Sequence, residues 1–475
     1  MDYTLPAGTA VGEYTIVATY SGTGNFDGSM DNSKKLTVGK RGTTTTAVDR
    51  SSTYSEQSVQ VALSATVAAT GSSVGAGTVS FQVKSGATNV GAAVTGAVSS
   101  AGVASVDYTL PAGTAVGEYT IVATYSGTGN FDGSMDNSKK LTVGKRGTTT
   151  TAVDRSSTYS EQSVQVALSA TVAATGSSVG AGTVSFQVKS GATNVGAAVT
   201  GAVSSAGVAS VDYTLPAGTA VGEYTIVATY SGTGNFVGST DGSRKLTVSK
   251  RATTTVAAAV SDQTYSATAT ALSLSATVSA IGSSVNAGTV TFQVMKAGTV
   301  IASGTSTTVA GGAASKVLTL PAGAAVGPYT VLATYSGTSN LVGSEGSRGF
   351  SLLYGWNGFL QPVNDTAHQT GLNESKFKLG QTIPVKFDLT NLQGQVVQQT
   401  GSPTFSRSDN LGACDATASA DTVPTVSPDA SAVYTSTGGH YQYNWSTKAM
   451  TAGEYKVFAN LADGTNQFVY ICLTK

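Results

Sequence analysis

The feature that most constrains this chain is an internal repeat with a period of 105 residues. One Pro-Ala-Gly phrase recurs at that spacing, beginning at Pro6, Pro111, Pro216 and Pro321. Residues 2–106 also recur letter for letter as residues 107–211. A period of this length is the size of one β-sandwich domain, so the repeat predicts a tandem array of domains and argues against one large fold.

Each copy of the repeat is separated from the next by a basic pair and a threonine run. The pairs are Lys40-Arg41, Lys145-Arg146 and Lys250-Arg251. We therefore expect a partial repeat at 1–40, full repeats at 41–145, 146–250 and 251–353, and a different domain at 354–475. Because such boundaries tend to be exposed, we expect trypsin to cut there first.

The start of the chain falls inside a repeat. Met1 stands where the next two copies carry Val106 and Val211, in front of the same Asp-Tyr-Thr-Leu-Pro phrase. We expect that the chain is truncated there, and that a signal peptide and further repeats precede it.

The residue pattern within a repeat predicts short strands. In VQVALSATV, residues 59–67, the apolar residues alternate, which places them on one face of a strand. Further alternating or β-branched runs, separated by Gly, Ser, Asn and Pro, occur at Thr43–Val48, Thr78–Val83, Val103–Leu110, Tyr119–Tyr125 and Lys139–Val143. The predicted fold class is all-β: tandem Ig-like antiparallel β-sandwiches, arranged as beads on a string.

A tyrosine two positions before an inward apolar residue is a further sign of this fold. In Gly117-Glu118-Tyr119-Thr120-Ile121, the tyrosine stands near the start of a late strand, as in a tyrosine corner. The corresponding candidates along the chain are Tyr14, Tyr119, Tyr224, Tyr329 and Tyr455.

Composition excludes several classes of protein. Lys+Arg and Asp+Glu balance at 26 each, which does not fit a nucleic-acid-binding domain. The alternating apolar runs argue against disorder, and the chain contains no apolar run of the roughly 20 residues that a membrane-spanning helix needs. The two cysteines, Cys414 and Cys472, both lie in the last segment and are candidates for one disulfide in an exported protein.

Residues 117–131 and 141–143 carry a phrase that resembles the bacterial Ig-like repeats of large surface proteins, and the resemblance covers 1–353. The last segment, with Pro384-Val385-Lys386-Phe387, resembles the PxKF-type domain of secreted proteins. The first resemblance implies a spacing or adhesive role without catalytic residues.

Several motifs of the repeats could in principle carry chemistry. GSSVG at 71–75 and 176–180 matches the Gly-x-Ser-x-Gly elbow of hydrolases, but the repeats contain no histidine to act as a base, which favours a plain turn. Alternating oxygen-bearing residues could bind calcium at Asp27, Ser29 and Asp31, and again at Asp132, Ser134 and Asp136. The remaining calcium ligands are missing, which favours hairpin loops.

The last segment holds the chain's two histidines and both tryptophans. His368 and His440 lack the neighbours of a metal site, so we expect no metal. Trp356, Trp445, Tyr441 and Tyr443 could form a sugar-stacking surface, although core packing is the simpler interpretation.

The sequence thus favours a non-catalytic structural stalk or spacer that is located outside the cell or on its surface. We expect a monomeric rod without cofactors, nucleic-acid partners or a membrane-spanning segment, and at most an unknown surface glycan or protein as a partner. Two alternatives stay open: a carbohydrate- or host-surface-binding module at 354–475, and the accessory tail of an exported enzyme whose catalytic domain lies upstream.

Overall fold

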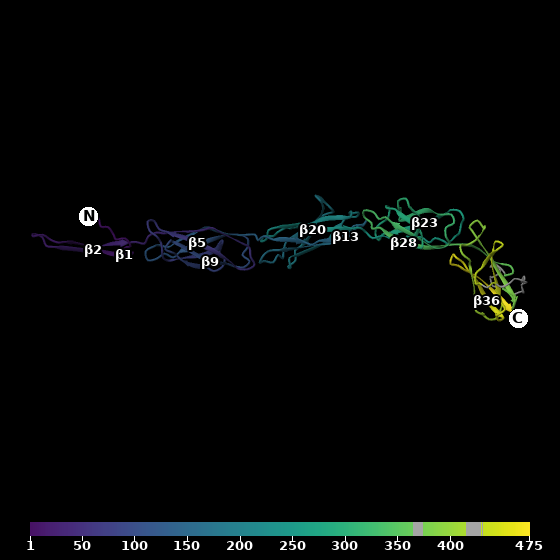
Figure 1. Ribbon diagram of the computed structural model, residues 1–475. Helices are drawn as coiled ribbons and strands as arrows, with labels where there is room; N and C mark the ends of the chain where they lie inside the picture. The colour runs from purple at the N-terminus through teal and green to yellow at the C-terminus, as the bar shows by residue number, and fades with distance from the viewer. Residues whose placement is uncertain (364–373, 415–428, 430) are drawn as a thin grey trace. The chain divides into compact units, whose positions relative to one another are not determined.

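The computed structural model describes residues 1–363, 374–414, 429 and 431–475, and every regular element in these residues is a β-strand (Figure 1). The predicted all-β fold class is therefore confirmed. Within the described residues, no helix is long and apolar enough to cross a membrane. The chain divides into two compact units, one made of residues 1–157 and 163–248 and the other of residues 158–162 and 249–475.

In the first unit, residues 41–145 form a two-sheet sandwich. One sheet has the order β3-β5-β9, and the other has the order β4-β11-β10-β6-β7, with β8 paired to β6. The strands are β3 (Thr44–Ala47), β4 (Arg50–Thr53), β5 (Val59–Ala68), β6 (Thr78–Ser85), β7 (Thr88–Asn89), β8 (Val94–Ala97), β9 (Val103–Leu110), β10 (Gly117–Tyr125) and β11 (Ser134–Gly144).

The core of this sandwich follows from the alternation in its strands. On β5, Val61, Leu63, Ala65 and Val67 are buried, whereas the residues between them point outward. They pack in one cluster with buried residues of β10, including Ile121. Because side chains on a strand alternate between its two faces, this pattern buries one face of each sheet against the other.

Residues 146–250 repeat this sandwich strand for strand. Its sheets have the orders β12-β14-β18 and β13-β20-β19-β15-β16, with β17 paired to β15. The strands are β12 (Thr149–Ala152), β13 (Arg155–Thr158), β14 (Val164–Ala173), β15 (Thr183–Ser190), β16 (Thr193–Asn194), β17 (Val199–Ala202), β18 (Val208–Leu215), β19 (Gly222–Tyr230) and β20 (Ser239–Ser249).

Residues 1–40 contribute a two-stranded hairpin made of β1 (Gly12–Tyr20) and β2 (Ser29–Val38). Most of its residues are exposed, including apolar ones such as Ile16. The hairpin therefore forms its backbone ladder but buries no core of its own.

In the second unit, residues 251–353 form a further sandwich. Its sheets have the orders β21-β23-β26 and β22-β28-β27-β24-β25. The strands are β21 (Thr254–Ala257), β22 (Gln263–Thr264), β23 (Thr270–Ser279), β24 (Val290–Lys296), β25 (Thr299–Thr305), β26 (Ala313–Leu320), β27 (Gly327–Tyr335) and β28 (Ser344–Leu353).

The last segment also consists of two sheets, but its strand order and its core residues differ from those of the repeats. One sheet has the order β29-β31-β35-β34, with β32 paired to β31, and the other has the order β30-β37-β36-β33. The strands are β29 (Gly355–Leu360), β30 (Ser375–Lys378), β31 (Thr382–Thr390), β32 (Val396–Val397), β33 (Thr404–Arg407), β34 (Thr435–Thr437), β35 (His440–Ser446), β36 (Gly453–Asn460) and β37 (Asn466–Thr474).

Candidate functional site

The candidate tyrosines all donate a hydrogen bond to the backbone four residues earlier. The Tyr119 hydroxyl donates to the Ala115 carbonyl at 2.7 Å, and the Tyr455 hydroxyl donates to the Thr451 carbonyl at 3.1 Å. Tyr14, Tyr224 and Tyr329 make the same bond at 2.6–2.7 Å. Each bond fixes the chain just before a late strand, which is a structural role.

The structure brings Cys414 and Cys472 together as a disulfide with a Cα–Cα distance of 5.4 Å. The bond joins the loop after β33 to β37, 58 residues further along the chain. A carboxylate oxygen of Glu374 lies within 4.8 Å of the sulfurs. Because the sulfurs are bonded to each other, neither is a thiolate that could bind a metal ion there.

Two of the three Gly-Ser-Ser-Val loops, at 176–179 and 282–285, have a carboxylate partner. Glu56 accepts hydrogen bonds from the backbone and side chain of Ser178, and Glu161 accepts the same bonds from Ser284. These bonds lower the pKa of Glu56 and of Glu161, because they stabilise the charged carboxylate. These two loops therefore serve in this structure as carboxylate-binding turns.

One aspartate of the candidate calcium loop, Asp136, has partners within the protein for both of its carboxylate oxygens. Asp136 accepts hydrogen bonds from Ser138 through one carboxylate oxygen and from the Ala47 amide through the other, at 2.7–2.8 Å. Burial alone would raise the pKa of Asp136, but the bonds from Ser138 and Ala47 and the charge of Lys139 outweigh it and lower the pKa. Asp136 thus ties β11 to β3.

Of the two histidines, His440 lies in the described residues and His368 lies outside them. The Nδ1 atom of His440 is 2.5 Å from a carboxylate oxygen of Asp388, and the histidine side chain is about half exposed. This pair is an exposed bridge between β31 and β35.

The four aromatic residues considered for sugar stacking pack in or against the core of the last segment. Trp445 and Tyr441 are buried, and Trp356 and Tyr443 pack against the same cluster. Phe387 stands at the centre, with its ring stacked 5.2 Å from that of Tyr441. These aromatics therefore hold the two sheets together.

A different set of aromatics, missed in the sequence analysis, lies on the outer face of β36 and β37. We call Phe458, Phe468 and Tyr470 the outer aromatic patch. Phe468 is 41% exposed, and the Lys456 ammonium lies 3.5 Å from the centroid of its ring. The available signal is that β37 has apolar residues on both faces, as in Phe468-Val469-Tyr470-Ile471.

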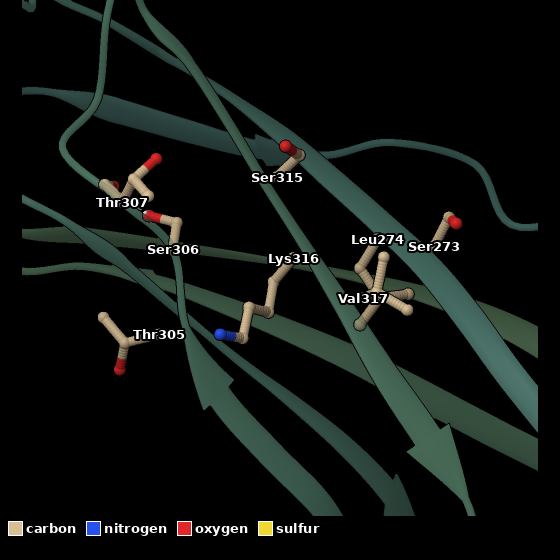
Figure 2. Close-up of a pocket in the computed structure, with 8 residues that line it drawn as sticks. All are labelled: Ser273, Leu274, Thr305, Ser306, Thr307, Ser315, Lys316 and Val317. Carbon is tan, nitrogen blue, oxygen red and sulfur yellow. Dashed lines mark hydrogen bonds between the residues drawn. The ribbon is translucent and has the colours of Figure 1, made fainter.

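A groove of about 440 Å³ opens on the sandwich formed by residues 251–353. Figure 2 shows the Lys316 side chain extending from β26 toward Thr305 and Ser306. Lys316 stands where the two earlier repeats carry Val106 and Val211. The lining offers hydroxyl groups and one ammonium group, and it includes no carboxylate, histidine or cysteine with which to build a catalytic pair.

Comparison with known proteins agrees with this architecture. The family model of the bacterial Ig-like domain (group 3) matches residues 45–144 and again residues 150–249. The chain contains two tandem bacterial Ig-like domains. No curated protein matches the chain.

Solved structures with similarity to the chain include a tetra-tandem repeat from the extending region of a large adhesion protein. It has 17% identity and a TM-score of 0.32, and the match covers 91% of this chain and 99% of that one. The eight N-terminal Ig domains of Down Syndrome Cell Adhesion Molecule have 11% identity and a TM-score of 0.22, with 98% and 52% covered. Fibronectin(III)-like modules of Clostridium thermocellum CbhA have 17% identity and a TM-score of 0.17, with 43% and 94% covered.

Proposed function

We propose that this chain is a non-catalytic spacer of a bacterial surface or secreted protein, in which tandem sandwiches hold another domain away from the cell. The observation that carries the proposal is the letter-for-letter duplication of a whole repeat, residues 2–106 and 107–211. Duplication of a complete sandwich adds length while leaving each copy's core unchanged.

The local structure supports a mechanical role for the repeats. Their polar side chains bond to the protein's own backbone, as in Asp136 with the Ala47 amide and Tyr119 with the Ala115 carbonyl. Their cores combine aliphatic residues with buried aromatic ones such as Phe81 and Tyr108, and they contain no cysteine, so their folding does not depend on oxidation. In the last segment we propose a PxKF-type domain, with Pro384-Val385-Lys386-Phe387 on β31, that follows the repeat 251–353.

The proposal is tested by locating the chain in its organism of origin. An antibody raised against residues 354–475 should label intact, unpermeabilised cells or detect the chain in the culture medium. Protease added outside the cells should remove the surface signal while a cytoplasmic marker stays intact. Detection of the chain in the cytoplasmic fraction alone would contradict the proposal.

The outer aromatic patch favours a second candidate function, a carbohydrate-binding module in the last segment. Exposed rings can stack on the faces of sugar rings, and Lys456 adds a hydrogen-bond donor beside them. Affinity electrophoresis in gels that contain bacterial or host polysaccharides tests this candidate. Binding predicts retarded migration that Phe468→Ala abolishes and that Val396→Ala, at an exposed apolar residue outside the patch, preserves.

A further inference from the structure

The Gly-Ser-Ser-Val loop, which resembles a hydrolase elbow in sequence, contacts a neighbouring repeat. In the first unit, the loop at 176–179 belongs to the repeat 146–250. It meets the turn Tyr54-Ser55-Glu56 of the repeat 41–145. Val179 is buried below the serine pair, and this anchors the loop on its own sandwich.

Turn and loop exchange hydrogen bonds in both directions. The Ser178 amide and hydroxyl donate to the Glu56 carboxylate at 2.9 and 2.8 Å, and the Glu56 amide donates to the Ser177 hydroxyl at 3.4 Å. A carboxylate that accepts two donors from one residue fixes both the distance and the orientation of its partner.

Arg146 and a ring contact complete this junction. The Arg146 guanidinium donates to the Tyr54 carbonyl of one repeat and to the Thr175 carbonyl of the other, each at 2.5 Å. The Tyr54 ring meets the Phe236 ring edge-on, with centroids 5.5 Å apart. The basic pair that predicts an exposed tryptic site thus includes an arginine that is tied to both sides of the boundary.

The same arrangement recurs within the second unit. The Ser284 amide and hydroxyl donate to Glu161 at 2.9 Å. Arg251 donates to the Tyr159 carbonyl and to the Ile281 carbonyl at 2.5 and 2.6 Å. The same contact thus forms at equivalent positions one repeat further along the chain, so it is a property of the repeat sequence.

In the first full repeat, no Tyr-Ser-Glu turn among the described residues lies against the surface that corresponds to Arg146 and the loop 176–179. Residues 2–40 correspond to 107–145, so they hold no counterpart of the turn 54–56. Arg41 is exposed where Arg146 is half-buried, and Phe131 is half-buried where Phe236 is buried. The two sandwiches share their strand order, so these differences accompany the presence of the turn.

The repeat 251–353 carries a different turn, and a different domain follows it. Its counterpart is Tyr265-Ser266-Ala267, which has no glutamate. The Leu392 amide donates to the Tyr265 carbonyl at 2.7 Å, and the Gln393 side chain donates to the Ser266 hydroxyl at 3.3 Å. The glutamate is thus present where a Gly-Ser-Ser-Val loop follows and absent where none follows.

We propose that the arginine and the Gly-Ser-Ser-Val loop of a repeat form a docking surface for the Tyr-Ser-Glu turn of another copy of the repeat. Within this chain, the surface at Arg146 and Ser178 takes the turn at 54–56 and holds adjacent repeats in a set orientation. The open surface at Arg41 and Ser73 fits the same turn of a further copy. This inference does not depend on where the protein is located or on whether it acts as a spacer.

Distance measurement between spin labels tests the proposal on the full chain. The repeats contain no cysteine, so Thr66→Cys and Thr171→Cys place one label on an exposed strand position of each repeat. The disulfide Cys414–Cys472 is left oxidised. Double electron–electron resonance should give a narrow distance distribution for this pair, and Glu56→Ala should at least double its width.

Matched variants make the test specific. Ser178→Ala removes one of the two donors and should broaden the distribution less than Glu56→Ala, whereas Glu56→Gln keeps an acceptor and should also broaden it less. Glu118→Ala removes an exposed carboxylate elsewhere in the same repeat and should leave the width unchanged. A wild-type distribution as broad as that of Glu56→Ala, or equal widths for Glu56→Ala and Glu118→Ala, would overturn the proposal.

Discussion

Residues 2–40 and 107–145 have the same sequence and different surroundings. Both segments form an antiparallel hairpin, β1–β2 in one and β10–β11 in the other, and both shift register at the same place, between Ile16 and Ala18 and between Ile121 and Ala123. Ile16 is 47% exposed, whereas Ile121 is 1% exposed. The sequence of the hairpin therefore determines its ladder and its bulge, and the burial comes from the rest of the sandwich.

The difference lies in what the hairpin's partners supply. β10 pairs with β6, and β11 pairs with β4, so both edges of the second hairpin are covered. The sheet β3-β5-β9 then closes over its apolar face. An isolated two-stranded hairpin is marginally stable in water because it lacks such a face. Stability in this chain is thus a property of the complete sandwich.

The largest difference in stability is expected when the same substitution is made in both hairpins. Ile121→Ala should lower the free energy of unfolding of its repeat by roughly 2–5 kcal/mol, because it leaves a cavity in a closed core. Ile16→Ala should change stability by less than about 0.5 kcal/mol, because the side chain is already in contact with water. Calorimetry of the full chain measures both effects, and equal effects would show that residues 1–40 bury a core.

The last segment contains a third hairpin for comparison, which a disulfide links to the rest of its domain. β36–β37 opens with the same Gly-Glu-Tyr phrase, and the disulfide joins Cys472 on β37 to Cys414. Reduction should destabilise this segment by roughly 2–4 kcal/mol, because it releases a 58-residue loop in the unfolded state. It should leave the cysteine-free repeats unchanged.

The composition offers a direct way to measure this effect. Both tryptophans, Trp356 and Trp445, lie in the last segment, so their fluorescence reports on that segment alone. Denaturant unfolding followed by tryptophan fluorescence should shift on reduction, while the calorimetric transitions of the repeats stay in place. A chain with Cys414→Ser and Cys472→Ser provides the control, since the reductant should then have no effect.

A third test uses the aspartate that links the two sheets. Asp136 accepts a hydrogen bond from the Ala47 amide in the opposite sheet, whereas Asp31, its counterpart in the first hairpin, bonds to the nearby Ser33 amide. Hydrogen bonds to charged groups contribute roughly 1.5–3 kcal/mol and less when exposed, so Asp136→Asn should cost about 1–1.5 kcal/mol. Asp31→Asn should leave the calorimetric transitions unchanged.

The effect of Asp136 should depend on pH in one direction. Its pKa is lowered in the folded protein, so its contribution is present above the pKa of the unfolded chain and is lost as pH falls through the folded pKa. The difference in stability between wild type and Asp136→Asn should therefore begin to shrink as pH falls below the unfolded value of about 3.9, and it should vanish only below the lowered folded pKa. A constant difference between them across acidic pH would show that the carboxylate's charge is not what ties the sheets.

Much of the sandwich could be predicted from the sequence because its main strands alternate clearly. The run Val103–Leu110 matches β9 in full, and the alternation at 59–67 matches the buried face of β5. β4 was missed because Arg50-Ser-Ser-Thr is polar and short, and it becomes a strand by pairing in parallel with β11. Short edge strands of this kind depend on a partner that is distant in sequence.

The contacts between repeats could not be predicted either, because the residues that form them are distant in sequence. Glu56 and Ser178 are 122 residues apart, and neither residue is unusual in its local sequence. The match to the Gly-x-Ser-x-Gly pattern predicts a plain turn in the absence of a histidine, and it says nothing of what faces that turn. A comparison of copies carries the available signal, since the glutamate of the turn is replaced by Ala267 in the last repeat.

The smallest expected effect concerns the tyrosine of the hairpin. Tyr14 and Tyr119 each donate to an alanine carbonyl at 2.7 Å, so the bond itself does not depend on the sandwich. Its contribution should depend on the sandwich, because Tyr119 is 8% exposed and Tyr14 is 38% exposed. Removing the hydroxyl from a buried site leaves the Ala115 carbonyl without that donor, whereas water can replace the Tyr14 hydroxyl. Tyr119→Phe should therefore cost about 0.5–1 kcal/mol and Tyr14→Phe close to nothing, as measured by calorimetry of the full chain. If both substitutions cost the same, the tyrosine acts by ordering the loop before the strand and not through its burial in the closed core.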